Sequence, residues 1–103
     1  MTVTIGEEKL QTMYDTLQDG DDLPEKVDPE TIVAERKAEL EDVQGSVSRG
    51  SLEEQSASIR HSIAQAFAEN YEHDRSRIDI SDLALYVHLC TDVQLDNSAK
   101  HHL

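Results

Sequence analysis

The sequence has little of what usually builds a large core or a chemical site. Its 103 residues include one cysteine, which excludes an internal disulfide and favours a reducing compartment. There is no tryptophan, and there are only one phenylalanine and three tyrosines, so aliphatic side chains must supply most of the core. Small domains with modest cores often gain stability by oligomerising. We therefore expect a single domain over residues 1–103, with a homodimer as an open alternative.

Positive charge is also scarce. Nine basic residues face 22 acidic ones, which gives a net charge of −13. Direct binding to nucleic acid or to an anionic membrane is disfavoured, because both require positive charge. The sequence shows neither an apolar run of about 18 residues nor a basic segment followed by an apolar one near its start. We therefore expect no membrane span and no signal peptide, and we expect a cytoplasmic protein.

Patterns for metal, cofactor or nucleophile chemistry are weak. The Asp-rich loop around Gly20 does not fit a calcium-binding loop, because a Leu and a Lys fall where oxygen ligands are needed. His88 and Cys90 would diverge on a helix, and His101 and His102 belong to a polar tail, so a converging zinc ligand set is not expected. An apolar run around Cys90 raises the pKa of its thiol. We expect no catalytic, cofactor-binding or metal-binding residue, and no cofactor.

Periodicity and capping signals predict an all-α fold, a small bundle of about four helices at residues 5–18, 29–44, 52–73 and 82–93. Thr4 and Glu7 have the spacing of a capping box for the first helix.

Loops separate the first three of these elements. An acidic loop at 19–27 follows the first helix, with Gly20 available for a left-handed turn. Asp28, followed by proline, reads as the N-cap of the second helix. A Gly/Ser hinge at 44–50 precedes the third helix, for which Ser51 reads as the cap.

The third and fourth predicted helices carry the clearest apolar patterns. The third has an apolar row that we expect to face the core, made of Leu52, Ile59, Ile63, Ala66, Phe67 and Tyr71. The fourth, capped by Asp79 or Ser81, is apolar all round, which is typical of a buried helix. Its residues also alternate with a period of two, so a strand is an open alternative. From residue 96 to 103 we expect a flexible polar tail.

The acidic charge is concentrated in one part of the chain. Residues 7–42 hold 13 acidic and 4 basic residues, a net of −9, against −4 for the remainder. Carboxylates at helical i, i+4 spacing form rows that fit a basic surface on another protein. General solubility and adaptation to high salt remain alternatives. The predicted partner-binding residues are Asp22, Glu25, Asp28, Glu35, Glu39 and Asp42.

The apolar segment 83–93 offers a second surface. It forms either the centre of the core or a site of self-association, whose predicted contacts are Leu85, Tyr86, His88 and Leu89. The leading functional interpretation is a small non-enzymatic regulator or inhibitor, of the kind bacterial and phage genomes encode, that binds a protein partner with a basic surface. Two alternatives stay open: a mimic of nucleic acid that occupies the basic groove of a DNA- or RNA-binding protein, and a structural component that self-associates through 83–93.

Overall fold

The computed structural model describes residues 3–46 and 52–103, a compact and mostly helical domain with one very small sheet. In chain order its elements are β1 (Thr4–Ile5), α1 (Glu7–Gln18), the 3₁₀ turn η1 (Glu25–Val27), α2 (Pro29–Ser46), α3 (Leu52–His73), the 3₁₀ turn η2 (Arg75–Arg77), α4 (Ile80–Cys90), β2 (Gln94–Leu95) and α5 (Asn97–Lys100).

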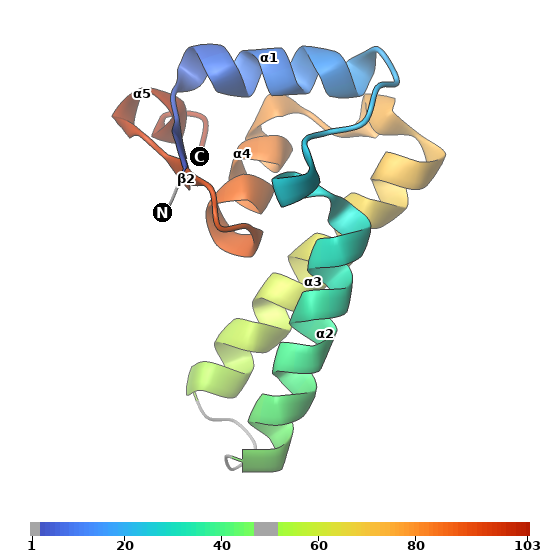
Figure 1. The fold of residues 1–103 in the computed structure, drawn as a ribbon, viewed down its shortest axis with the longest axis vertical. Helices are drawn as coiled ribbons and strands as arrows, with labels where there is room; N and C mark the ends of the chain where they lie inside the picture. The colour runs from blue at the N-terminus through green and yellow to red at the C-terminus, as the bar shows by residue number, and fades with distance from the viewer. Residues whose placement is uncertain (1–2, 47–51) are drawn as a thin grey trace.

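The molecule has a compact part and a projecting part (Figure 1). Helix α1 lies across one end, with α4 below it and the β1–β2 pair and α5 at one side. Helices α2 and α3 pack side by side and extend away from this end as a hairpin. The principal extents of 42, 31 and 22 Å reflect the projection. We call β1, α1, α4, β2 and α5 the body, and α2 with α3 the hairpin.

Helix α4 is the centre of the core, as its apolar sequence predicted. Its buried residues include Leu83, Val87 and Cys90, none of which is exposed to solvent. The ring of Tyr86 stacks on Phe67 of α3 with centroids 4.1 Å apart. Helical geometry therefore holds through Cys90, and the strand alternative for this segment is wrong. An apolar helix surrounded by neighbours satisfies its backbone hydrogen bonds internally, which a lone strand cannot do.

The N-cap of α4 agrees with the sequence prediction. The carboxylate of Asp79 accepts a hydrogen bond from the backbone N–H of Asp82 at 2.8 Å. The side chain of Asp82 accepts one from the N–H of Asp79 at 3.3 Å, which completes a reciprocal capping box.

The predicted capping box at α1 is wrong. The N-cap is Gly6, which has no side chain to accept a hydrogen bond, and Thr4 belongs to β1. The backbone N–H of Glu7 instead donates to the hydroxyl of Ser98 at 3.0 Å, from the other end of the chain. β1 pairs in parallel with β2, Ile5 opposite Leu95, and this pairing brings the distant hydroxyl into place.

The segment 96–103, expected to be a flexible tail, contains helix α5. Asp96 caps this helix by accepting hydrogen bonds from the N–H groups of Ser98 and Ala99. Ala99 is fully buried against the core. One small apolar residue in a polar stretch is a weak sequence signal, and the tertiary contact outweighs it.

Helix α2 has the predicted N-cap, but it ends later than predicted. Asp28 accepts hydrogen bonds from the N–H of Glu30 and the hydroxyl of Thr31 at the start of α2. α2 then continues to Ser46, so residues 44–46 of the predicted hinge at 44–50 are helical. The rest of that hinge and the predicted cap Ser51 lie outside the described residues.

Helix α3 has the predicted bounds, but only part of its predicted row faces the core. Phe67 is buried, and Ile63 and Tyr71 are half-buried against the core. Leu52 is 82% exposed and Ile59 is 58% exposed, while Ala57 and Ala64, outside the row, are buried. The helix packs mainly on α2 and contacts α4 from about Arg60 onwards, through the Cys90 thiol and the Phe67–Tyr86 stack. The row that we expected to face the core is therefore turned partly towards solvent.

Candidate interaction surfaces

Three of the predicted acidic residues lie close together, and two of them have internal roles. Asp22, Glu25 and Asp28 line one hollow of about 360 Å³. The carboxylate of Asp22 accepts hydrogen bonds from the Tyr71 hydroxyl at 2.8 Å and from Arg75 at 3.2 Å. These bonds, that from Tyr71 first, hold the pKa of Asp22 below its usual value. Asp28 is the cap of α2.

Glu39 is the most strongly engaged of the predicted residues. Its two carboxylate oxygens pair with Arg36 of the same helix and with Arg60 of α3. Arg36, whose side chain is only 15% exposed, also donates to the backbone oxygen of Cys90 at 2.9 Å. The pair of arginines thus joins α2 to α3 and α4, and it neutralises the centre of the predicted row Glu35, Glu39 and Asp42.

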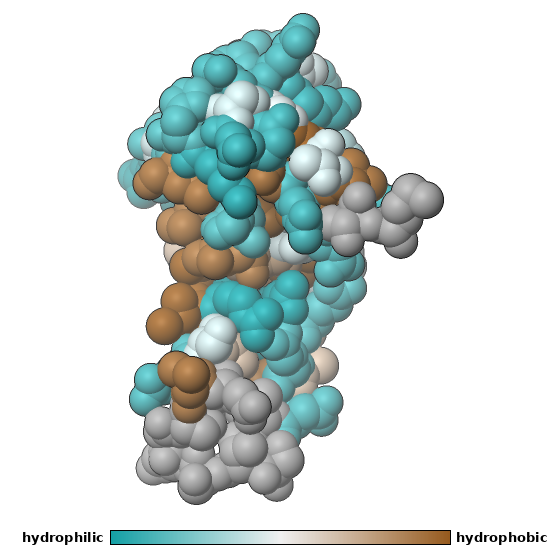
Figure 2. All heavy atoms as spheres, turned by 90° about the vertical axis from the view of Figure 1, so that its left-hand side faces the viewer, coloured by the Kyte–Doolittle hydropathy of each residue, from teal (hydrophilic) through white to brown (hydrophobic). Residues whose placement is uncertain are grey.

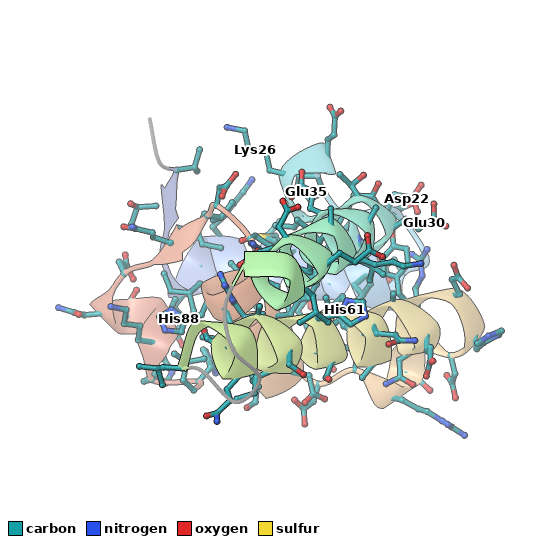
Figure 3. The ribbon with its side chains drawn as sticks, turned by 90° about the horizontal axis from the view of Figure 1, so that it is seen from below. Asp22, Lys26, Glu30, Glu35, His61 and His88 are labelled. Atoms are coloured by element: carbon teal, nitrogen blue, oxygen red, sulfur yellow. The ribbon has the colours of Figure 1, made fainter. Side chains whose placement is uncertain are left out.

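The remaining predicted carboxylates face solvent in different places. Glu25 and Glu35 line a second hollow of about 380 Å³, together with Asp92 and Lys26. Figure 3 shows Glu35 and Lys26 on the same side of the molecule. Asp42 is exposed near the far end of α2. The acidic residues therefore form two neighbouring hollows and an outlying position rather than one uninterrupted row.

A different surface stands out on α3, and we call it the apolar face: Leu52, Ile59, Ile63, Ala66 and Leu85. Figure 2 shows apolar atoms following the hairpin and continuing onto the body. Leu85 of α4 is 39% exposed. Beside it lies a hollow of about 210 Å³ whose lining includes Ile63, Ala66 and Leu85.

The exposed residues in the middle of α3 carry no charge, although Asp82 of α4 lines the hollow beside Leu85. Between positions 55 and 66 of α3, the exposed residues are Gln55, Ser56, Ser58, Ile59, Ser62, Gln65 and Ala66. Over positions 30–42 of α2, the exposed residues are Glu30, Thr31, Ala34, Glu35, Lys37, Ala38, Glu41 and Asp42, of which five are charged. The two helices of the hairpin thus present very different surfaces to solvent.

The four predicted self-association residues differ in their exposure to solvent. Leu85 and His88 are exposed and Leu89 is half-buried, but Tyr86 is fully buried. A buried side chain cannot reach a partner, so Tyr86 is wrong as a contact residue. Burial also raises the pKa of Tyr86 far above its usual value.

Cys90 behaves as its apolar surroundings predicted. The thiol is buried and lies 3.4 Å from the backbone oxygen of Arg60, to which it donates. Burial raises the pKa of this thiol, which disfavours the reactive thiolate form.

A small group of polar residues collects where the two ends of the chain meet. Nε2 of His101 and Nε2 of His102 lie 3.4 and 3.6 Å from the same Oε1 atom of Glu7. The two imidazole rings lie against each other with centroids 4.0 Å apart. Both histidines were expected to belong to a flexible tail, and only the order of α5 reveals this grouping.

No family model matches the chain, and neither a curated protein nor a solved structure matches it. Among the described residues, no helix combines the length and the apolar character needed to cross a membrane.

The sequence does contain the signal for the apolar face. Leu52, Ile59, Ile63 and Ala66 follow one another at intervals of seven, four and three. This spacing identifies a shared helix face but does not say what covers it.

Proposed function

We propose that the protein is a non-enzymatic protein-binding domain that self-associates through its apolar face. The observation that carries the proposal is an exposed apolar row on α3, whose exposed residues between 55 and 66 are uncharged in a chain of net charge −13. Charged residues are depleted at the centres of protein interfaces relative to the rest of a protein surface.

Apolar burial supplies the driving force. Burying a fully exposed Leu or Ile side chain contributes about 1.5–3 kcal/mol. Leu52, Ile59 and Leu85 keep 82%, 58% and 39% of their surface exposed, so each retains apolar area that a partner would remove from water. The hollow next to Leu85 offers a place for an apolar side chain of the partner.

The charge distribution favours a second copy as the partner. Two copies of a −13 chain repel each other wherever carboxylates approach. On the apolar face the exposed residues of α3 from 55 to 66 are uncharged, so two α3 helices meet there without facing carboxylates. A partner selected for acidic contacts would instead be expected to use α2.

The spacing of the row suits helix-on-helix packing. Intervals of three and four residues repeat in helices that pack side by side in coiled coils and bundles. The small side chains of Ser58 and Ser62 flank Ile59, and they allow two helix axes to approach closely. A twofold arrangement, in which both copies use the same face, is the common form of a homodimer.

The test is the solution mass of matched variants. Ile59→Asp places a charge in the apolar face, whereas Ala38→Asp adds the same charge at an exposed position of α2. Light scattering should give a dimer for the wild type and for Ala38→Asp, and a monomer of 11.6 kDa for Ile59→Asp. A monomeric wild type at every concentration, or equal masses for both variants, would contradict the proposal.

Salt separates this proposal from binding through the acidic surface. Added salt screens the repulsion between two acidic chains, so self-association should persist or strengthen as ionic strength rises. Binding of a basic partner to carboxylates should weaken under the same change. A dimer that dissociates steeply with salt would contradict an apolar interface.

A second candidate is binding of a basic protein at the hollow lined by Glu25, Glu35 and Asp92. Its support is the convergence of three carboxylates from η1, α2 and the segment before β2. Glu35→Gln should weaken capture of such a partner, while Glu41→Gln on the same helix should not. We do not extend the proposal to nucleic-acid mimicry, because Glu39 at the centre of the row is paired with two arginines.

A further inference from the structure

The two ends of the chain place three metal-ligating side chains together. One oxygen of Glu7 and one ring nitrogen each of His101 and His102 lie within 4.8 Å of one another. Two imidazoles and a carboxylate are a ligand set that zinc uses in proteins, with a water or another ligand completing the coordination. Calcium and magnesium prefer oxygen ligands and do not fit this set.

The distances agree with tetrahedral coordination. Zinc bonds of about 2.0–2.2 Å at tetrahedral angles place neighbouring ligand atoms about 3.3–3.6 Å apart. The two nitrogens lie 3.4 and 3.6 Å from the Glu7 oxygen. Two of the three edges of the ligand triangle thus already have the separation that zinc requires.

His102 provides a second and independent observation. Its side chain is 17% exposed, and its Nε2 atom is buried without a hydrogen-bond partner among the described residues. The 3.6 Å separation from Glu7 is too long for a hydrogen bond. A buried polar atom without a partner is unfavourable, and a metal ion bound at Nε2 would supply the missing interaction.

The surrounding backbone holds the three residues in place. The N–H of Glu7 donates to Ser98 at 3.0 Å. The N–H of His102 donates to the backbone oxygen of Ala99 at 3.2 Å, and Ala99 is buried in the core. The ligands therefore belong to two anchored segments, so little ordering is required when an ion binds.

We propose that Glu7, His101 and His102 form a zinc site that joins the start of α1 to the turn after α5. Glu7 and His101 are about half exposed, with side-chain exposures of 52% and 54%, so the ion reaches the site from solvent and keeps at least one position for water. The site stabilises the β1–β2 junction, and it is separate from the apolar face.

The test uses the full chain and zinc ions alone. Calorimetric titration should give one zinc per chain, and zinc should raise the melting temperature by several degrees when present well above its dissociation constant. Glu7→Gln, His101→Asn and His102→Asn should each weaken zinc binding at least tenfold and abolish the thermal shift. Circular dichroism without zinc establishes that each variant is folded.

His73→Asn and His88→Asn are the matched controls, because both remove an exposed histidine elsewhere. They should bind zinc as the wild type does. Retained affinity in any of the three ligand variants, an equal loss in the controls, or an equal thermal shift with calcium would overturn the site. Calcium would produce such a shift if the acidic surface bound divalent ions generally.

Discussion

The body and the hairpin differ in how completely they bury their apolar side chains. In the body, α4 has neighbours on several sides, and Leu83, Val87 and Cys90 are completely buried. In the hairpin, the first part of α3 has α2 as its neighbouring helix, and Leu52 and Ile59 remain largely exposed. A two-helix hairpin leaves half of each helix in water, so the composition of that uncovered half carries information about function.

The two helices of the hairpin differ from each other in the charge on their uncovered faces. Both have one buried face and one uncovered face, but the uncovered face of α2 is rich in charge and that of α3 is charge-free over residues 55–66. A solvated helix normally carries charged residues on its outer side. This difference is the reason for proposing the interface on α3 rather than on α2.

The largest expected effect contrasts a core leucine with an exposed one. Leu83→Ala removes a fully buried side chain and should lower the free energy of unfolding by about 2–5 kcal/mol. Leu52→Ala, measured where the chain is monomeric, should change it by no more than about 0.5 kcal/mol. Urea denaturation measures both, and similar losses would contradict the distinction between body and hairpin.

Removing the ion pairs of Glu39 should weaken the packing of α2 on α3 more than the rest of the fold. Glu39→Gln removes the carboxylate shared by Arg36 and Arg60, and it should lower the free energy of unfolding by about 1 kcal/mol, since the group is partly exposed. Hydrogen exchange should speed up in α2 and α3 more than in α4. Glu41→Gln, at an exposed position of the same helix, is the control; uniform acceleration throughout the chain would argue against a local effect.

Two tyrosines should respond in opposite directions. The Tyr86 hydroxyl is buried with no hydrogen-bond partner among the described residues, so Tyr86→Phe should raise the free energy of unfolding by about 1 kcal/mol. The Tyr71 hydroxyl donates to Asp22 and accepts from the N–H of Leu23, so Tyr71→Phe should lower it by a similar amount, about 1 kcal/mol. Chemical denaturation of both variants checks the signs, and a destabilised Tyr86→Phe would mean that this hydroxyl has a partner after all.

The smallest expected effect is on the stability of the fold at acid pH. The pKa of Asp22 is lowered in the folded state, so its contribution to stability is present above the unfolded pKa, near 3.8, and is lost as the pH falls through the folded value. Asp22→Asn should make stability less dependent on pH in this acid range. Denaturation at a series of pH values measures the slope, with Asp21→Asn as the neighbouring control; an unchanged slope would contradict the role of the Tyr71 and Arg75 bonds.

Local signals in the sequence predicted much of the helical architecture. The bounds of α3, the caps at Asp28 and Asp79 and the left-handed turn at Gly20 all follow from residue type and spacing. The φ of Gly20 is +89°, a conformation that glycine adopts without strain. Features of this kind depend on neighbours within one turn of the chain, which is why a single sequence reveals them.

Features that depend on distant residues were missed. The hydroxyl that caps α1 belongs to Ser98, 91 residues away, and α5 is ordered by the burial of Ala99. The pairing of Glu39 with Arg60 across the hairpin likewise changes the acidic row. The exposed side of α3 could not be told from a core-facing side, because periodicity identifies a face without identifying its neighbours.

The most direct test of the central claim is cross-linking through an introduced thiol. Ser62 is exposed near the middle of the apolar face, so twofold pairing of two α3 helices in either direction would bring its two copies close together. The native thiol of Cys90 is buried and has a raised pKa, so it should not interfere. Under mild oxidation Ser62→Cys should form a covalent dimer, while Ala38→Cys on α2 should remain monomeric; equal cross-linking of the two variants, or none in Ser62→Cys, would contradict self-association through α3.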